Sequence, residues 1–463
     1  MAKSPRVSLV PRFGRLRGAL ALAGLVAAPF ALALAQKPAP LALDSYTLPN
    51  GLKVILAEDH TAPVVAVDVT YNVGSRNETA GRTGFAHLFE HMMFEGSANV
   101  KKGEHMGMLE TAGSAGYNGS TIEDRTNYYQ PLPSNRLNLG LWLEADRMRS
   151  LDITEEKFKN QREAVKEERR LRVDNQPYTK VIFEDGYKAI DATNCYAYSH
   201  SIIGSMADLD AATTDDVRQF FKTYYAPNNA TLVVTGDFQP AEAKQLISQY
   251  FGDIPRAAPA PLTTCTPNFN AGARRERVLD TKATLPAVIK FYTVPSYDSP
   301  DYPALELLAT IVGRGQSSRL NRSLAREQKV ALGTQVFVNP FGPRRGPGSF
   351  VFLAIANNGV AIDTVDTKLS EQIAQLATSG VSAEELTKAK NAWRAQAINE
   401  RSRAISLAQA IQRATLFLGS PDRLDADFDR YGAVTADDLK RVAAQYLRPE
   451  NSYTFIDSAE AAK

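Results

Sequence analysis

The feature that most constrains this chain is a pair of histidines four residues apart, His87 and His91, with Glu90 directly before the second. On a helix, residues i and i+4 lie on the same face, so both imidazoles can reach one metal ion. Glu90 stands beside them, where it could act on a metal-bound water. The whole chain has only 5 histidines, so the pairing of two of them is informative. The alternative interpretation is two structural histidines.

A third metal ligand has to come from elsewhere, because a catalytic zinc ion usually has three protein ligands and one water. His60, His105 and His200 are isolated, and each is explained as a surface or loop residue. The acid-rich segment 155–173 is a better source. Its charges also suit a solvated helix with i,i+4 pairs, and composition does not choose among its glutamates.

The chain contains an internal repeat, which indicates a duplicated architecture. Segments 213–234 and 435–456 align at an offset of 222 residues. Each is expected to form a capped helix, a turn and a strand. Two halves of about 200 residues each follow from this repeat. The residues that match are Thr213, Asp215, Asp216, Tyr224, Pro227 and Asn229 with Thr435, Asp437, Asp438, Tyr446, Pro449 and Asn451.

The two halves are not equivalent in chemistry. The apolar segment 302–312 is expected to be a helix of the second half, and it has no histidine where the first half carries its pair. The Ala- and Pro-rich stretch 257–261 is typical of a linker. We therefore expect four parts: a signal peptide at 1–35, a metal-binding catalytic domain at 36–255, a linker at 256–275, and a homologous non-catalytic domain at 276–463.

The expected elements are mixed, which favours an α+β fold. A Pro49-Asn50-Gly51 turn should lead into a strand. We expect each domain to be a largely antiparallel sheet with helices packed on one face. The expected strands are 53–58, 64–73, 115–121 and 127–130, and the expected helices are 84–94, 137–149 and 155–173.

Residues 1–35 have the pattern of a secretory signal peptide. Five basic residues precede an apolar, Ala-rich stretch at 18–34, and Ala33-Leu34-Ala35 suits a cleavage site before Gln36. An uncleaved membrane anchor is the alternative, which Pro29 disfavours. Export through this signal predicts a periplasmic protein.

Removing the signal peptide takes the net charge from +2 to about −3, because five bases and no acids are lost. No large basic field then remains for nucleic acid or anionic lipid, and no other apolar run is long enough to span a bilayer. An oxidising compartment would permit a disulfide between Cys195 and Cys265. The sequence leaves open whether these two cysteines are joined, because it does not supply their geometry.

The histidine motif and its surroundings resemble the pitrilysin/insulinase family of zinc peptidases, which are inverzincins with the order H-x-x-E-H. The short members, similar to the mitochondrial processing peptidase β subunit and its bacterial periplasmic relatives, are the best match. The resemblance extends over nearly all of the chain after the signal peptide. It rests on segments 84–96, 117–121, 124–129 and 160–168, and on 317–320 in the second half.

This resemblance implies a zinc endopeptidase in which each domain is half of a clamshell. One zinc ion per chain would be held by His87, His91 and Glu168, with Glu90 as the general base. Glu168 lies 77 positions after His91, as the family ligand does, and Glu167 is the fallback. Many relatives carry another glutamate two turns earlier, where this chain has Gln161. Gln161 could orient a partner by hydrogen bonding, but it lacks the charge.

The resemblance also implies how substrate binds and where this chain departs from its relatives. In the family, the strand at Asn118 and Gly119 adds the substrate as a further β-strand, although these residues could also form a simple turn. Active relatives use an Arg…Tyr pair that falls here on Ala325 and Leu332, which cannot donate side-chain hydrogen bonds. We therefore expect a heterodimer with a metal-free paralogue that supplies the pair, while Arg326 keeps a homodimer possible.

The function expected is zinc-dependent hydrolysis of unfolded peptides or short polypeptides in the periplasm. Two alternatives of other classes remain: an assembly or scaffold subunit with vestigial chemistry, and a module that presents peptides to another protease. The complete set of His87, Glu90, His91 and Glu168 disfavours the scaffold, which would not need zinc.

Overall fold

The computed structural model describes residues 37–459, except residues 191, 194, 262, 264 and 271. The expected signal peptide at 1–35 lies outside the described residues. The described residues from Leu41 onward form one compact unit. No helix in the described part of the chain is long and apolar enough to cross a membrane.

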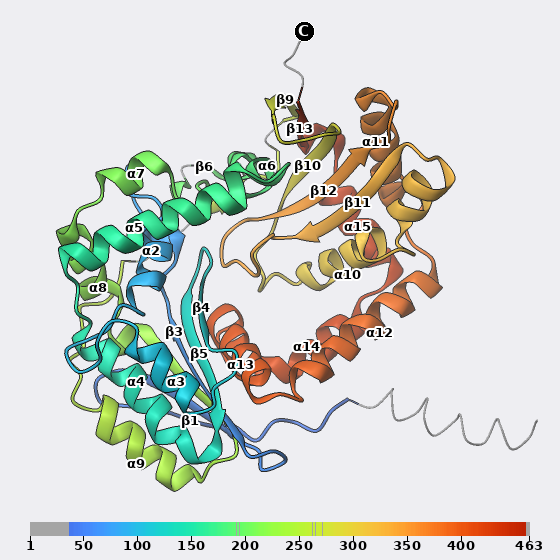
Figure 1. The fold of residues 1–463 in the computed structure, drawn as a ribbon. Helices are drawn as coiled ribbons and strands as arrows, with labels where there is room; N and C mark the ends of the chain where they lie inside the picture. Colours follow the sequence, from blue (N-terminus) through green and yellow to red (C-terminus); the bar gives the residue numbers. More distant parts are fainter. Residues whose placement is uncertain are drawn as a thin grey trace, which may run out of the picture. The chain divides into compact units, whose positions relative to one another are not determined.

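The first half is built on a six-stranded sheet with the order β1-β2-β7-β3-β5-β4 (Figure 1). Only β2 and β7 run parallel; the other neighbours are antiparallel. β1 and β2 form the hairpin expected at Pro49-Asn50-Gly51. The strands are β1 (Asp44–Thr47), β2 (Lys53–Glu58), β3 (Val64–Tyr71), β4 (Asn118–Thr121), β5 (Thr126–Pro133) and β7 (Ala230–Gly236).

The second half repeats this plan with the order β9-β13-β10-β12-β11, in which only β9 and β13 are parallel. The repeat predicted from the sequence is confirmed. α8 (Thr214–Tyr224) and α15 (Ala436–Tyr446) both begin with a threonine capping box, and each leads into an interior strand of its sheet, β7 or β13. The strands are β9 (Arg274–Leu279), β10 (Ala287–Val294), β11 (Ala331–Val338), β12 (Gly348–Ala356) and β13 (Tyr453–Ser458).

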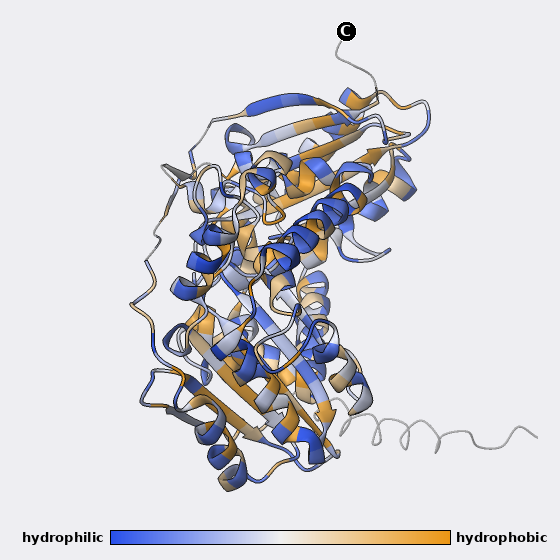
Figure 2. Ribbon diagram, turned by 60° about the vertical axis from the view of Figure 1, so that its left-hand side comes forward, coloured by the Kyte–Doolittle hydropathy of each residue, from blue (hydrophilic) through white to orange (hydrophobic). Residues whose placement is uncertain are grey.

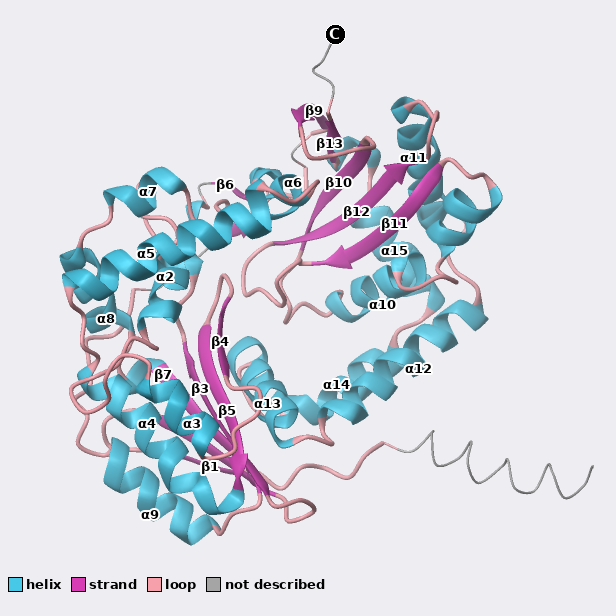
Figure 3. Ribbon diagram, viewed as in Figure 1, coloured by secondary structure: helices cyan, strands magenta, loops and turns pink. Residues whose placement is uncertain are grey.

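Helices surround both sheets (Figure 3), so the α+β class is confirmed. The other helices of the first half are α2 (Phe85–Met92), α3 (Glu104–Thr111), α4 (Leu137–Ser150), α5 (Glu155–Arg169), α6 (Thr179–Phe183), α7 (Met206–Ala211) and α9 (Pro240–Phe251). Those of the second half are α10 (Tyr302–Gly313), α11 (Ile362–Thr378), α12 (Ala383–Glu400), α13 (Ala404–Leu418) and α14 (Arg423–Ala433). α5 is followed by a π-helical turn, Arg170–Asp174, so the helix expected at 155–173 changes its hydrogen-bond pattern at its end.

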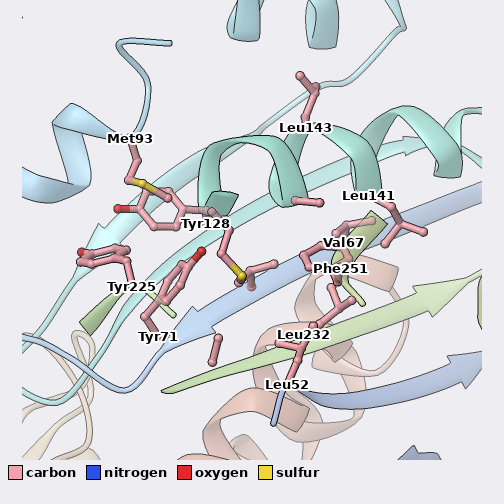
Figure 4. Close-up of a cluster of buried hydrophobic side chains, with 14 of the residues drawn as sticks. Leu52, Val67, Tyr71, Met93, Tyr128, Leu141, Leu143, Tyr225, Leu232 and Phe251 are labelled. Carbon is pink, nitrogen blue, oxygen red and sulfur yellow. The ribbon is translucent and has the colours of Figure 1, made fainter. Parts of the chain in front are cut away.

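Each sheet buries one face against the helices of its own half. In the first half, side chains of β3 such as Val67 pack with Leu141 of α4 and Phe251 of α9 (Figure 4). Figure 2 shows hydrophobic residues concentrated along the strands and hydrophilic residues on many of the helices. Burial of this apolar surface is the main force that holds each half together.

The opposite face of each sheet is covered by a segment of the other half, which the sequence did not indicate. Ile55 and Val233 of the first sheet pack against Leu407 and Ile411 of α13. In return, Phe291 of the second sheet packs with residues of α6 and of the 3-10 turn Asp185–Ala189. Besides the core that each half forms for itself, two further clusters of buried residues therefore contain side chains from both halves.

A disulfide joins Cys195 to Cys265, with a Cα–Cα distance of 5.2 Å, which answers the question left open by the sequence. It connects a 3-10 turn of the first half, Tyr196–Tyr198, to the segment between the two sheets. The short strands β6 (Ala192–Thr193) and β8 (Thr266–Pro267) pair next to it. The bond thus anchors the connecting segment to the first half.

Candidate metal centre and active site

Helix α2 presents its two histidines on the side opposite the core. Phe85, Leu88, Phe89 and Met92, at helical spacing, are buried in the core of the first half. The helix begins at Gly84 with a φ of 85°, and the carboxylate of Glu78 accepts hydrogen bonds from the backbone N–H groups of Gly84 and Ala86. This cap fixes the start of the helix, so His87 and His91 are directed toward α5.

The third side chain of the cluster is Glu168 in the last turn of α5, which lies beside α2 (Figure 1). Its Oε2 atom lies 3.4 Å from Nε2 of His87 and 3.3 Å from Nε2 of His91. Ligand atoms about 2.0–2.1 Å from a tetrahedral zinc ion are about 3.3 Å apart. The two distances from Glu168 therefore match two edges of such a site, and the ligand atoms of all three residues lie within 4.8 Å of one another.

The other residues considered as ligands lie elsewhere. Within the described residues, His87, His91 and Glu168 form the one group of three or more metal-ligand side chains that are close enough to share an ion. Glu167 pairs with Arg170. His60 pairs with Glu58 and Asp237, His200 with Glu78, and His105 packs its ring against Phe94.

The pKa shifts of His87 and Glu168, two of the three members of the cluster, suit metal ligation. Burial, assisted by the nearby His91, lowers the pKa of His87 to about 4, so this imidazole is neutral at pH 7. The contact with His91 lowers the pKa of Glu168 to about 2, so this carboxylate is ionised. Burial alone would lower the pKa of His91, but its contacts with Glu168, Glu90 and Gln161 raise it. A neutral imidazole and an ionised carboxylate are the forms that bind metals.

Glu90 lies against β4, the edge strand of the first sheet. Its Oε2 atom accepts a hydrogen bond of 2.7 Å from the hydroxyl of Thr121. Burial raises the pKa of Glu90, and the Thr121 hydrogen bond opposes that rise. Gly119 makes this approach possible, because a Cβ atom there would come within 2.9 Å of Cγ of Glu90. Glu90 of the sequence motif therefore contacts two residues of β4, Gly119 and Thr121.

The structure adds three polar residues that sequence reasoning missed or left without a partner. Thr121 belongs to the segment 117–121 that supported the resemblance, but its spacing alone did not indicate contact with Glu90. Gln161 accepts a hydrogen bond from Nδ1 of His91, with a separation of 3.2 Å. Glu95, which receives a hydrogen bond from Gln161, belongs to the segment 84–96 that supported the resemblance, but nothing in the sequence indicated this contact.

Fold and site together define the class: a duplicated α+β protein with a candidate His/His/Glu metal site in its first half. Comparison with protein families supports this class. Residues 53–202 match the family described as Insulinase (Peptidase family M16), and residues 211–393 match the Peptidase M16 inactive domain. The chain belongs to the insulinase (M16) family of peptidases, and its candidate metal site of His87, His91 and Glu168 is consistent with an active member.

Individual relatives agree with this assignment. The chain is 31% identical over 423 residues to the zinc protease PqqE of Helicobacter pylori, covering 89% of this chain and 91% of that one. It is 24% identical to a probable mitochondrial-processing peptidase subunit beta of Arabidopsis thaliana, covering 87% of this chain and 75% of that one. The resemblance to processing peptidases and bacterial zinc proteases is thus confirmed.

Solved structures show the same fold. The crystal structure of a protease from Helicobacter pylori superposes with a TM-score of 0.84 at 28% identity, covering 91% of this chain and 100% of that one. The periplasmic protease PqqL of Escherichia coli superposes with a TM-score of 0.73 at 19% identity, covering 92% of this chain and 48% of that one. At that identity, the PqqL match concerns the fold alone.

Proposed function

We propose that this protein is a zinc-dependent endopeptidase that hydrolyses unfolded peptides or short polypeptides. The observation that carries the proposal is the convergence of His87, His91 and Glu168 next to the partly buried carboxylate of Glu90. Two neutral nitrogens and one carboxylate are a common ligand set of catalytic zinc, whereas calcium and magnesium prefer oxygen ligands alone. One zinc ion per chain would occupy this site.

Each residue of the site has a distinct part in the proposed reaction. Bound zinc would polarise the scissile carbonyl and make a water molecule more acidic. Glu90 takes the proton of the attacking water at its carboxylate and then passes a proton to the leaving amine. Its raised pKa makes it a better proton carrier near neutral pH than an exposed glutamate. Thr121 holds one carboxylate oxygen in place.

We further propose that substrate binds along β4. This strand lies at the edge of the first sheet and pairs only with β5 among the described strands. An extended peptide could add to its outer edge through backbone hydrogen bonds, which give affinity with little dependence on sequence. Asn118 opens this strand and is exposed, while Gly119 lies against Glu90. A peptide paired with β4 would therefore pass close to the catalytic carboxylate.

A partner subunit is part of the proposal. At the positions where active relatives carry an Arg…Tyr pair, Leu332 is 63% exposed on the edge strand β11, and Ala325 has no polar side chain. Arg326 is engaged with Gln316, at 3.2 Å. We expect a metal-free paralogue to supply the pair in a heterodimer, with a homodimer as the alternative. Measuring the mass of the purified chain in solution, with and without a co-expressed paralogue, separates these two assemblies.

The proposed location is the periplasm. The signal-like segment 1–35 and the Cys195–Cys265 disulfide both suit an exported protein, because disulfides persist in oxidising compartments. N-terminal sequencing of the protein from a periplasmic extract should begin at Gln36. Recovery of the intact N-terminus from the membrane fraction would instead indicate an uncleaved anchor.

The test of the proposed activity is cleavage of a quenched, unstructured peptide pool by residues 36–463. We expect cleavage that a chelator abolishes and added zinc restores. If the zinc-loaded chain is inactive alone but becomes active when the paralogue is added, the heterodimer is supported. A folded chain that neither binds zinc nor cleaves in either assembly contradicts the proposal and favours the scaffold alternative. Zinc and peptide binding without turnover would favour the presenting module.

A further inference from the structure

One of the two histidine ligands is connected to a series of side chains that reaches the protein surface. Nδ1 of His91 lies 3.2 Å from Oε1 of Gln161, and Nε2 of Gln161 donates to Oε1 of Glu95 over 2.7 Å. The other oxygen of Glu95 forms an ion pair of 2.9 Å with the partly exposed Lys102. By contrast, the buried Nδ1 of His87 has no hydrogen-bond partner among the described residues.

The direction of these hydrogen bonds is determined by Glu95. An ionised carboxylate can only accept hydrogen bonds, so the Gln161 amide must turn its NH2 group toward Glu95. Its carbonyl oxygen then faces His91, where it can only accept. The proton of the neutral His91 ring is therefore held on Nδ1, and the lone pair of Nε2 remains free on the side of Glu168. Without Glu95, the amide could turn over and present its NH2 group to His91.

The surroundings favour a built arrangement over a chance surface contact. Glu95 is only 6% exposed, although it carries a charge, and it lies three residues after the last residue of the helix that holds both histidines. Burying a carboxylate is costly unless its partners compensate, and Gln161 and Lys102 are those partners here. Partners of this kind that orient a metal-binding histidine commonly change metal affinity by 10–100-fold when they are removed.

We propose that Glu95 is a positioning residue for His91, acting through Gln161, and that the two side chains together take the place of a single carboxylate behind this ligand. The proposal rests on the zinc site of the proposed function. In this proposal, the Gln161 amide makes the hydrogen bond to His91, and Glu95 determines the orientation of that amide. Lys102 balances the charge of Glu95 and contributes little to the orientation.

The test measures zinc affinity at constant pH by competition with a chromogenic chelator, in the full chain after residue 35. We expect Glu95→Leu to weaken zinc binding by about 10–100-fold, and Gln161→Leu to do the same. Lys102→Met is the matched control, because it removes the ion pair and leaves the carboxylate; it should change affinity less than about threefold. The melting temperature of each metal-free variant shows whether the fold is retained.

A swapped double variant gives the decisive comparison. Glu95→Gln combined with Gln161→Glu places the carboxylate next to His91 and the amide behind it, so the carboxylate again accepts from both sides. We expect it to bind zinc within about threefold of the unaltered chain and to restore the cobalt absorption spectrum that Glu95→Leu disturbs. If Glu95 only stabilised the 95–102 turn, the double variant would not restore zinc binding, because it still lacks the Glu95–Lys102 ion pair.

The results separate this proposal from the proposed function. The positioning role is overturned, while the zinc site stands, if the unaltered chain binds zinc and Glu95→Leu binds it equally well. It is also overturned if the double variant does not restore zinc affinity. If the unaltered, folded chain binds no zinc, both proposals are overturned.

Discussion

At the scale of single residues, Glu90 has the surroundings of a proton carrier. It is partly buried, its pKa is raised by that burial, and Thr121 holds one of its oxygens. Glu90→Gln keeps the size and the hydrogen-bonding capacity of the side chain but cannot take up a proton. We expect kcat to fall by about 10²–10⁴-fold while zinc affinity changes little. Zinc loss in this variant would show that Glu90 has a structural role in the metal site.

At the scale of elements, the edge strand β4 must approach helix α2 closely. We expect Gly119→Ala to push Glu90 out of position, because the new Cβ would lie 2.9 Å from its Cγ atom. Displacement of a catalytic group by about 1 Å can lower kcat by up to about 100-fold. Steady-state kinetics on the quenched peptide would measure this loss, and unchanged kcat would show that Glu90 has room to adjust.

A matched glycine provides the control. Gly107 is an exposed glycine in the middle of α3, and a Cβ atom there would meet no atom within 4 Å. Gly107→Ala should leave kcat unchanged and raise the free energy of unfolding by about 0.5–1 kcal/mol, because alanine is the better helix residue. A loss of activity in this variant would mean that α3 takes part in substrate binding.

The elements themselves were largely predictable, because they depend on local patterns. The repeated Thr–x–x–Asp caps marked the starts of α8 and α15, and alternating apolar residues marked β3. The histidine pair was predictable from helical spacing alone. The choice of Glu168 over Glu167 needed the family resemblance, because composition does not tell which side of α5 faces α2.

Other features could not be predicted because they depend on contacts between distant segments. Nothing in the sequence of α13 shows that it covers the sheet of the first half, since its apolar face would suit its own half equally well. The Glu95–Gln161–His91 contacts likewise join residues 66 and 70 positions apart. Tertiary packing, which has no local signature, decides such features.

At the scale of the whole molecule, buried charges join the two halves. Arg344, on the loop between β11 and β12, is 1% exposed and forms an ion pair with Glu123 at the end of the β4–β5 hairpin. Arg344→Met leaves Glu123 buried without its counter-charge, so we expect a loss of about 3–5 kcal/mol in the free energy of unfolding. Adding Glu123→Gln should recover part of that loss in urea unfolding. Equal losses in the single and double variants would show that the pair is not coupled.

A second contact between the halves predicts a pH dependence of stability. Asp68 of β3 receives a hydrogen bond from Gln412 of α13, and burial raises its pKa to about 6. A carboxyl group whose pKa is higher in the folded protein than in the unfolded chain stabilises the fold below pH 4, and this stabilisation is lost as the pH rises through about 6. Between pH 5 and pH 8, the titration of Asp68 should lower the free energy of unfolding by about 1 kcal/mol.

This contribution can be isolated with Asp68→Asn, which does not titrate. Raising the pH from 5 to 8 should lower the free energy of unfolding of this variant by about 1 kcal/mol less than it lowers that of the unaltered chain. Urea unfolding at both pH values measures the difference. Identical pH dependence in the two proteins would show that Asp68 titrates normally in the folded state.

The central claim, a zinc site completed by Glu168, is tested most directly by metal analysis of two neighbouring variants. Glu168→Gln removes the proposed ligand, whereas Glu167→Gln changes the adjacent glutamate, which pairs with Arg170. We predict one zinc ion per chain in the unaltered protein and in Glu167→Gln, and strongly weakened binding in Glu168→Gln. Loss of zinc from Glu167→Gln with retention in Glu168→Gln, or a folded unaltered chain without zinc affinity, would contradict the account.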